Sequence, residues 1–372
     1  MMPLYRIEKR PTSTVISFGV NAPESYLAFD RAGRPFVFND RGYTYKRSLD
    51  GSLHLRYRDL ANDWRERRVL SFKEAKEVLE RAYEQIGRAR TELSERAEEI
   101  LRWTPDKLLR EEKMRFREVY RFPISILPPD AYLDIVVQAT FGCTWNKCTF
   151  CSFYKDRLFS KRDEASFRKH VRSVRDFFGQ SLSLRRNVFL ADGNVLALGE
   201  PLLPLMDTVR TFFPGRKIAS FLDLWSGYKK GGDWWQTLAE RGLSRVSIGL
   251  ESGSSKLLKL FNKPGEPEEA IELVHALKRA GLAVNIIFLV GAGGRPFREE
   301  HFLSSMHVLS KLPLRREDIV YLSPLVRNAE LETLDPDLTS LPDMDGELRR
   351  WFEGVSALGY KASLYDIREF LY

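Results

Sequence analysis

The chain has 372 residues, 43% of them apolar, which is enough for one full-sized α/β domain and a smaller extension. Apolar runs such as residues 286–290 are far too short to cross a bilayer, and no apolar segment follows the first charges. We therefore expect a soluble cytoplasmic protein that has no membrane partner. The net charge of +8 is modest for this length and does not separate nucleic-acid binding from binding of a phosphorylated substrate.

The first part of the chain shows two patterns. Up to residue 70, short aromatic-rich runs alternate with turns such as Asp-Gly, which predicts a small antiparallel β-meander. Over residues 71–129 the apolar residues recur with the period of a helix, and a proline-containing linker follows. Ser71 is the expected N-cap of the first helix, and Glu74 stands three residues later, as in a capping box. The meander strands are expected at 15–18, 26–29, 35–38, 43–46 and 53–57.

From residue 130 onward, strand-like and helix-like segments alternate. The strands are expected at 132–138, 187–191, 218–222, 245–250, 284–290 and 319–322, and the helices at 164–178, 200–212, 233–241, 267–280 and 298–309. Such alternation is typical of parallel β/α units. We predict an α/β fold in which residues 130–327 form a partial (β/α)6 TIM-like barrel. Residues 328–372 are expected to be a tail, helical near 348–357, that carries no chemistry.

All three cysteines of the chain, Cys143, Cys148 and Cys151, fall within nine residues. Disulfide frameworks are not built this way, so a metal site in a reducing compartment is the better interpretation. The loop follows the first barrel strand, at the end where barrels place their chemistry. A four-iron cluster held by three thiolates would keep one iron open.

Two other interpretations of the cysteines stay open. A structural zinc ion needs a fourth ligand, and the nearest histidine, His170, is expected on the following helix. Buried inert thiols are the second possibility, although such thiols do not normally cluster on a glycine-containing loop.

The segment Cys148-Thr149-Phe150-Cys151 resembles the signature loop of the radical SAM superfamily, CxxxCxΦC, in which Φ is aromatic. Four residues rather than three separate Cys143 from Cys148, so this is a variant CX4CX2C spacing. The resemblance implies a [4Fe–4S] cluster, S-adenosylmethionine and a 5′-deoxyadenosyl radical that abstracts hydrogen from a substrate. It also implies an electron-donor protein such as ferredoxin or flavodoxin, and a small-molecule substrate more than an RNA.

Later strands carry further segments that resemble the family. Residues 191–194, Ala-Asp-Gly-Asn, stand where the family has a Gly-Gly-Glu-like segment that receives the methionine amino group. Residues 249–253, Gly-Leu-Glu-Ser-Gly, resemble the elongator-type and methylthiotransferase members. The resemblance implies cofactor contacts from Phe150, Asp192, Gly193, Asn194, Glu251, Ser252, Gly291 and Tyr321. It assigns no catalytic residue.

Each of these segments also has a plainer interpretation. Residues 192–194 fit an ordinary turn, Glu251 a structural ion pair, and Tyr321 a core strand. Asp223 and Trp225 end the third strand and are further candidates. His275, His301 and His307 lie on expected helices, where a solvated or core role is preferred.

With every cysteine committed to one site, no auxiliary cysteine-ligated cluster and no catalytic thiol remain. The alternative function is a nucleic-acid-binding protein stabilised by a zinc or iron–sulfur knuckle, with the basic N-terminal region on the phosphates.

Overall fold

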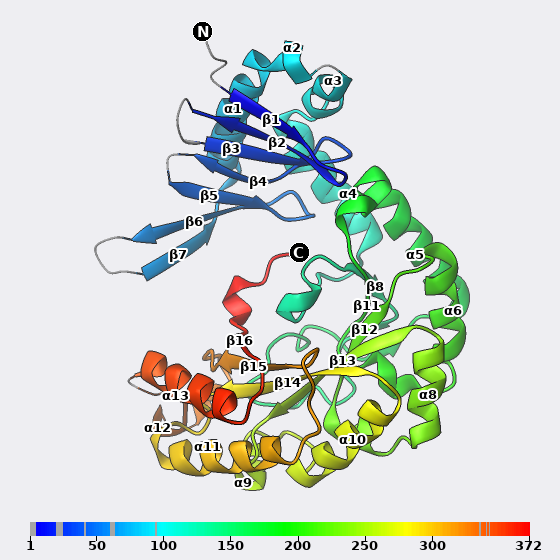
Figure 1. Ribbon diagram of the computed structural model, residues 1–372, viewed down its shortest axis with the longest axis vertical. Helices are drawn as coiled ribbons and strands as arrows, with labels where there is room; N and C mark the ends of the chain where they lie inside the picture. Colours follow the sequence, from blue (N-terminus) through cyan, green and yellow to red (C-terminus); the bar gives the residue numbers. More distant parts are fainter. Residues whose placement is uncertain are drawn as a thin grey trace. The chain divides into compact units, whose positions relative to one another are not determined.

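The computed structural model describes residues 5–19, 25–40, 42–59, 64–93, 95–334, 336–339, 341 and 343–372 (Figure 1). The chain divides into two compact units. The first comprises Met1–Pro123, Arg172–Arg186 and Leu371–Tyr372, and the second comprises Ile124–Val171 and Asn187–Phe370.

The first unit contains an antiparallel sheet whose seven strands pair in chain order. The strands are β1 (Tyr5–Lys9), β2 (Ser13–Phe18), β3 (Ser25–Asp30), β4 (Pro35–Asp40), β5 (Tyr43–Arg47), β6 (Leu53–Asp59) and β7 (Trp64–Val69). The predicted meander strands fall in β2 to β6. The two outer strands were not predicted, because charged residues obscure their alternation.

The helical part of the first unit supplies one wall of its core. It consists of α1 (Phe72–Arg88), α2 (Arg90–Leu93), α3 (Glu95–Leu101), the π-helical turn η1 (Lys107–Glu111) and α4 (Glu112–Val119). The N-cap of α1 is Ser71, whose N–H donates to Glu74 Oε2 at 2.8 Å, and Glu74 N–H donates back to Ser71 Oγ at 3.3 Å. This capping box fixes the start of the helix. The cross-strand neighbours Ile16, Leu27 and Phe38 then pack with apolar residues of α1.

The second unit contains a parallel sheet of seven strands in the order β16-β15-β14-β13-β12-β11-β8. The strands are β8 (Ile135–Gln138), β11 (Val188–Ala191), β12 (Ile218–Leu222), β13 (Leu243–Glu251), β14 (Ala283–Val290), β15 (Ile319–Pro324) and β16 (Ala362–Leu364). All six predicted strands are present. Within the described residues β8 and β16 each have one partner in this sheet, so the barrel is open, as predicted.

The seventh strand, β16, departs from the predicted six-stranded barrel because it comes from the tail at residues 328–372. Its register pairs Tyr321 with Ser363, and Tyr365 N–H donates to Leu322 O at 2.9 Å. Three residues are too few to show a period, so β16 could not be recognised from the sequence. The tail is therefore part of the barrel.

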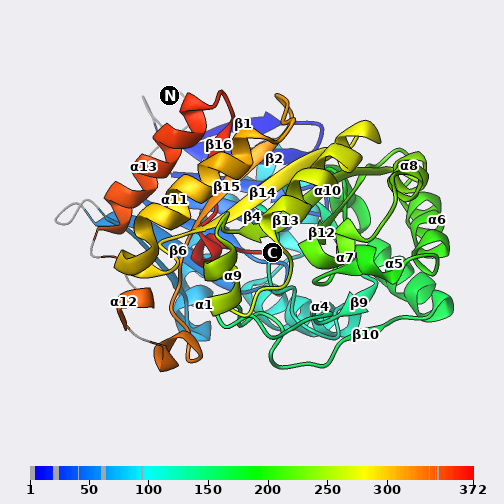
Figure 2. The same ribbon diagram turned by 90° about the horizontal axis from the view of Figure 1, so that it is seen from below.

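Helices flank the outer side of this sheet (Figure 2). The helices from residue 164 onward are α5 (Glu164–Phe178), whose last residues belong to the first unit, α6 (Leu202–Phe212), α7 (Leu224–Tyr228), α8 (Gly232–Glu240), α9 (Ser255–Leu260), α10 (Pro267–Arg279), α11 (Gly294–Ser310), α12 (Pro336–Thr339) and α13 (Met344–Ala357). Short 3-10 turns are η2 (Pro129–Ala131), η3 (Gly179–Leu184), η4 (Val195–Leu198), η5 (Leu331–Thr333) and η6 (Ile367–Glu369). None of the helices in the described part of the chain is long and apolar enough to cross a membrane.

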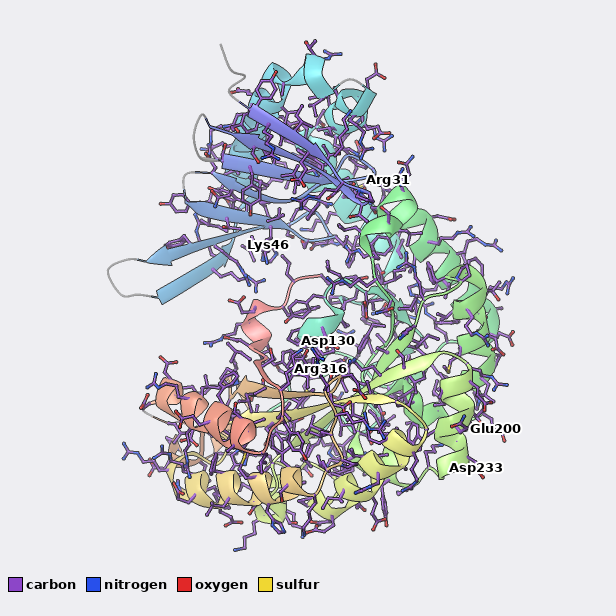
Figure 3. The ribbon with its side chains drawn as sticks, in the orientation of Figure 1. Arg31, Lys46, Asp130, Glu200, Asp233 and Arg316 are labelled. Atoms are coloured by element: carbon purple, nitrogen blue, oxygen red, sulfur yellow. The ribbon has the colours of Figure 1, made fainter. Side chains whose placement is uncertain are left out.

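Asp130, which is labelled in Figure 3, is the centre of a polar network that joins three neighbouring strands of the barrel. Its carboxylate accepts hydrogen bonds from Tyr321 Oη at 2.9 Å and from Asn285 Nδ2 at 3.1 Å, and Arg245 Nε lies 3.3 Å away. Asn285 and Arg245 lie near the amino ends of their strands. The opposite, carboxyl ends are where open α/β sheets place their ligand sites.

Candidate functional site

The cysteine loop lies at the carboxyl end of the first barrel strand, as predicted. After β8 the chain forms a short ribbon in which β9 (Thr140–Phe141) pairs antiparallel with β10 (Ser160–Lys161). The cysteines lie on the loop between these two strands. All three are half-buried and line the same cavity.

Hydrogen bonds fix the shape of the loop across the variant spacing. Asn146 adopts φ 53°, a left-handed conformation that Asn tolerates, and its Nδ2 donates to Tyr154 O at 2.7 Å. Trp145 Nε1 donates to Asn262 O at 2.7 Å, and Asn262 Nδ2 donates to Lys147 O at 3.0 Å. The extra residue is thus accommodated in a turn that is fastened to the segment after α9.

The cavity and its open mouth together contain roughly 1000 Å³ of empty space. Apolar and aromatic side chains make up most of its wall, and its polar groups are few. The lining includes the three cysteines, Phe150, Phe153, Tyr154, Gly193, Asn194, Phe221, Asp223, Glu251, Lys263, Ile287, Leu289, Ser323, Tyr365 and Ile367. Of the predicted cofactor contacts, Phe150, Gly193, Asn194 and Glu251 therefore meet in one place, together with the candidate Asp223.

Asn194 and Asp223 form the polar wall beside Cys143. Asn194 Nδ2 donates to Ser226 Oγ at 2.9 Å, to Thr144 Oγ1 at 3.1 Å and to the Asp223 carboxylate. A Cβ on Gly193 would lie 2.9 Å from the carbonyl oxygen of Gly142. The chain after β11 therefore packs directly against the cysteine loop, and only glycine fits there.

Glu251 and Lys263 form a buried ion pair in the same cavity. Their Oε1 and Nζ atoms are 3.9 Å apart, and the side chains are 15% and 11% exposed. Burial raises the pKa of Glu251 against the opposing effect of Lys263. Burial also disfavours the Lys263 ammonium, but Glu251, Cys148 and Asp223 outweigh it and raise the pKa of Lys263. The raised pKa keeps Lys263 an ammonium at neutral pH, facing the side chain of Glu251.

Lys263 was not predicted from the sequence. It belongs to the Lys-Pro-Gly segment after α9, which has no motif of its own. Glu251, at the end of β13, has φ 67°, and the register of β13 with β14 shifts between Gly249 and Glu251. This bulge re-aims the carboxylate, as bulges beside active sites often do.

The chemistry of the thiols fits a bound metal centre. Burial raises the pKa of Cys148 to about 11 and that of Cys151 to about 12. In this surrounding the thiols stay protonated at neutral pH unless a metal cation stabilises the thiolates.

An iron–sulfur cluster fits the arrangement better than a zinc ion does. Among the residues that the structure describes, no three His, Cys, Asp or Glu side chains converge on a single metal-ion position. A tetrahedral zinc site requires such convergence, whereas a four-iron cluster binds each cysteine at a different iron. His170, the candidate fourth zinc ligand, is buried and accepts a hydrogen bond from Gln138 N–H at 2.9 Å.

Two of the predicted contacts, Asp192 and Ser252, are not among the residues that line the cavity. Asp192 is buried beside Arg157, whose Nη1 is 3.5 Å from Oδ2, and burial raises the pKa of Asp192 to about 6. Ser252 Oγ lies 2.8 Å from Nδ1 of the buried His301 and accepts from Ser254 N–H at 3.0 Å. Both side chains thus have polar partners outside the cavity lining.

Gly291 and Tyr321 also lie outside the cavity lining. Gly291 has φ 87°, a left-handed conformation that favours glycine. Tyr321 donates its hydroxyl to Asp130 and packs in an apolar cluster with Ile126 and Tyr365. The hydrogen bond and packing of Tyr321 agree with its plainer interpretation as part of a core strand, and the predicted cofactor contacts of both residues stay predictions.

The remaining candidates divide between surface and core. Trp225 is half-buried outside the cavity lining and contacts Trp145, with ring centroids 6.4 Å apart. His275 and His307 are exposed on helices, and His301 is in the core.

A sequence model described as the radical SAM superfamily matches residues 137–306, which include all three cysteines, Glu251 and Lys263. One relative is 4′-phospho-dehydrooxetanocin synthase of Priestia megaterium, 21% identical over 178 residues that cover 42% of this chain. An uncharacterised protein of Methanopyrus kandleri is 38% identical over 58 residues, 16% of this chain. The aligned parts span only 23% and 11% of these two relatives.

A solved structure with a similar fold is coproporphyrinogen III oxidase from Escherichia coli, a radical SAM enzyme. It superposes with a TM-score of 0.50 and 16% identity, over 67% of this chain and 56% of that one. The likeness shows a common fold and agrees with the parallel sheet described above. The match to the radical SAM superfamily thus covers residues 137–306, slightly less than half of the chain, and the parallel sheet agrees with a radical SAM fold.

Proposed function

We propose that Cys143, Cys148 and Cys151 hold one [4Fe–4S] cluster and that the chain cleaves S-adenosylmethionine reductively. One observation carries this proposal: the three thiols open into the same cavity as the ends of β11 and β13. When bound, the cluster and S-adenosylmethionine supply a 5′-deoxyadenosyl radical, which abstracts hydrogen from a small-molecule substrate. The electron comes from a donor protein such as ferredoxin or flavodoxin.

The polar lining suits the methionine part of the cofactor. The carboxylates of Glu251 and Asp223 can accept hydrogen bonds from its ammonium group, and Lys263 can pair with its carboxylate. Phe150 offers a ring edge or face to the adenine, and it is held at 85° to the ring of Phe261. The proposed cofactor site therefore contains Lys263 in addition to residues that were predicted from the sequence.

The apolar wall suits an uncharged part of the substrate. Phe153, Phe221, Ile287 and Tyr365 line the cavity without a charged group among them. Such a wall orients an apolar group and excludes water from the radical step. The segment Gly-Leu-Glu-Ser-Gly at residues 249–253 supports the hypothesis that the chain is related to the elongator-type and methylthiotransferase members of the superfamily.

The alternative, a knuckle protein that binds nucleic acid, has one observation in its favour. Lys46 (Figure 3), Arg56 and Arg67 share one face of β5, β6 and β7, and burial together with these arginines lowers the pKa of Lys46. Phosphates would relieve this repulsion.

Anaerobic reconstitution with iron and sulfide tests the proposal. The wild-type chain should turn brown, absorb near ~400 nm as thiolate-ligated iron does, and form 5′-deoxyadenosine from S-adenosylmethionine under dithionite. Replacing all three cysteines by alanine should abolish iron binding and product together. Product formation that survives this replacement, or a colourless zinc protein with salt-sensitive RNA affinity, would refute the proposal.

A further inference from the structure

Two tryptophans and two lysines form a surface patch beside the cysteine loop. We define this Trp–Lys patch as Trp145 and Lys147 of the loop, with Trp225 of α7 and Lys229 directly after α7. The two indole rings contact each other at 62°, with centroids 6.4 Å apart. Lys147 Nζ lies 5.3 Å from the Trp145 ring centroid, and Lys229 Nζ lies 4.6 Å from that of Trp225.

The patch is joined to the cluster ligands through covalent and hydrogen bonds. Trp145 and Lys147 lie between Cys143 and Cys148, in the stretch where the loop is one residue longer than the family pattern. Thr144 Oγ1 donates to Asp223 Oδ2 at 3.2 Å, and Asp223 caps α7 by accepting from Ser226 N–H at 2.8 Å. Loop and helix therefore present the patch as one unit.

The proposed reaction requires a protein partner at this loop. Each reductive cleavage consumes one electron. The chain has only three cysteines, and all of them line the cavity, so no cysteine-ligated relay cluster can carry electrons from elsewhere in the chain. A donor has to approach the cysteine loop itself.

The chemistry of the patch favours an acidic partner. Lys147 and Lys229 are exposed, and none of the four patch residues is acidic. An ammonium group lies over each indole, and the rings are steeply inclined, so they do not offer parallel free faces on which successive bases could stack. Aromatic side chains beside cations are typical of the centre of protein interfaces.

We propose that the Trp–Lys patch docks the electron donor, a small acidic protein that carries single electrons. This inference rests on the proposed function. One electron passes from the reduced carrier to the cluster, so the carrier is oxidised by one electron as the cluster is reduced, and no covalent bond forms or breaks. Such encounters use small interfaces, and opposite charge speeds their formation.

The test compares charge reversal in the patch with matched charge reversal elsewhere. The variant is Lys147→Glu/Lys229→Glu, and the control is Lys169→Glu/Lys311→Glu, two exposed lysines on α5 and after α11. Reduced bacterial flavodoxin and a bacterial ferredoxin serve as probes. Affinity is measured on the reconstituted and the metal-free protein at low and high salt, and 5′-deoxyadenosine formation is measured with each carrier and with dithionite.

The patch variant should bind the carrier at least about tenfold more weakly at low salt, with a smaller difference at high salt, and its carrier-driven rate should fall in parallel. Its dithionite-driven rate should equal that of the control, which also verifies its fold. Lys147→Gln/Lys229→Gln should give an intermediate loss.

Several results would overturn the docking proposal. One is that the patch variant and the control bind the carriers equally well and have equal carrier-driven rates. Another is that neither carrier binds the wild type. A third is that the patch variant loses affinity for single-stranded RNA but keeps its affinity for the carriers. Failure of the proposed function is a separate result, because the wild type would then form no 5′-deoxyadenosine even with dithionite.

Discussion

Removing the charge of Lys263 should destabilise the protein before any cofactor is bound. At 3.9 Å, and with both side chains less than a sixth exposed, the attraction between Lys263 and Glu251 is worth about 4 kcal/mol at an effective dielectric constant near 20. Breaking one partner of a buried pair costs roughly 3–5 kcal/mol, because the other charge is left in a poorly solvated site. We expect Lys263→Met to lower the free energy of unfolding by about 3 kcal/mol.

A double-mutant cycle on the metal-free chain measures the pair itself. Lys263→Met, Glu251→Gln and the double variant are unfolded in urea, and tryptophan fluorescence follows the transition. The double variant should be less destabilised than Lys263→Met, since no buried charge is left in it, and the coupling energy should be about 2–3 kcal/mol. A coupling energy below about 0.5 kcal/mol would mean that water in the cavity mouth screens the two charges. This result would refute the claim that Lys263 and Glu251 form a strong buried ion pair.

The effect of Lys263→Met should depend on pH in a defined direction. Without Lys263, burial alone acts on Glu251 and holds its folded-state pKa above the unfolded value of about 4.3. Such a carboxyl costs no stability below the unfolded pKa, and the cost grows as the pH rises through the folded pKa. The variant should therefore approach the wild type near pH ~4 and differ from it most near pH ~8. A difference that is constant over this range contradicts the assignment to Glu251.

Three further predictions concern the cysteine loop and its neighbours. Burial raises the pKa of Cys148 to about 11 and that of Cys151 to about 12. In the metal-free protein at pH ~8.5, iodoacetamide should therefore alkylate Cys148 roughly 100-fold and Cys151 roughly 1000-fold more slowly than a free cysteine, and rates equal to that of a free thiol contradict this. Gly193→Ala should displace the cysteine loop and lower the iron bound per chain, whereas Gly231→Ala, with open space around it, should bind iron as the wild type does. Burial raises the pKa of Asp192 to about 6, so ionisation of this carboxyl lowers the stability of the wild type as the pH rises through that value. Between pH ~4 and ~8, the free energy of unfolding of Asp192→Asn should therefore rise by about 2–3 kcal/mol relative to that of the wild type, as measured by urea unfolding. A difference between the two proteins that does not change with pH would refute this prediction.

The elements that local sequence controls were predicted well. The helix at 164–178 has the predicted bounds, and the strand at 218–222 does as well. Both follow from the hydrophobic period, which neighbouring residues alone create. The cysteine loop was also predictable, since its spacing and its place after a strand are local properties.

The choice among adjacent site residues was not predictable from local sequence. Asp192 and Asn194 flank one glycine, yet only Asn194 reaches the cavity, and Glu251 lines the cavity whereas its neighbour Ser252 packs against His301. Successive side chains at a strand end point to opposite sides, so a bulge or a change of register decides which of them faces the site.

By itself the sequence determined the chemistry of this protein: three thiols on one loop, a strand before them, and alternating β/α units that put such loops at one edge of a sheet. Only the tertiary structure brought Lys263 opposite Glu251, added β16 to the barrel, and placed Tyr365 and Ile367 in the wall of the cavity. These residues lie in segments without periodicity or motif, and contacts between residues far apart in the chain, which no local pattern encodes, fix their positions.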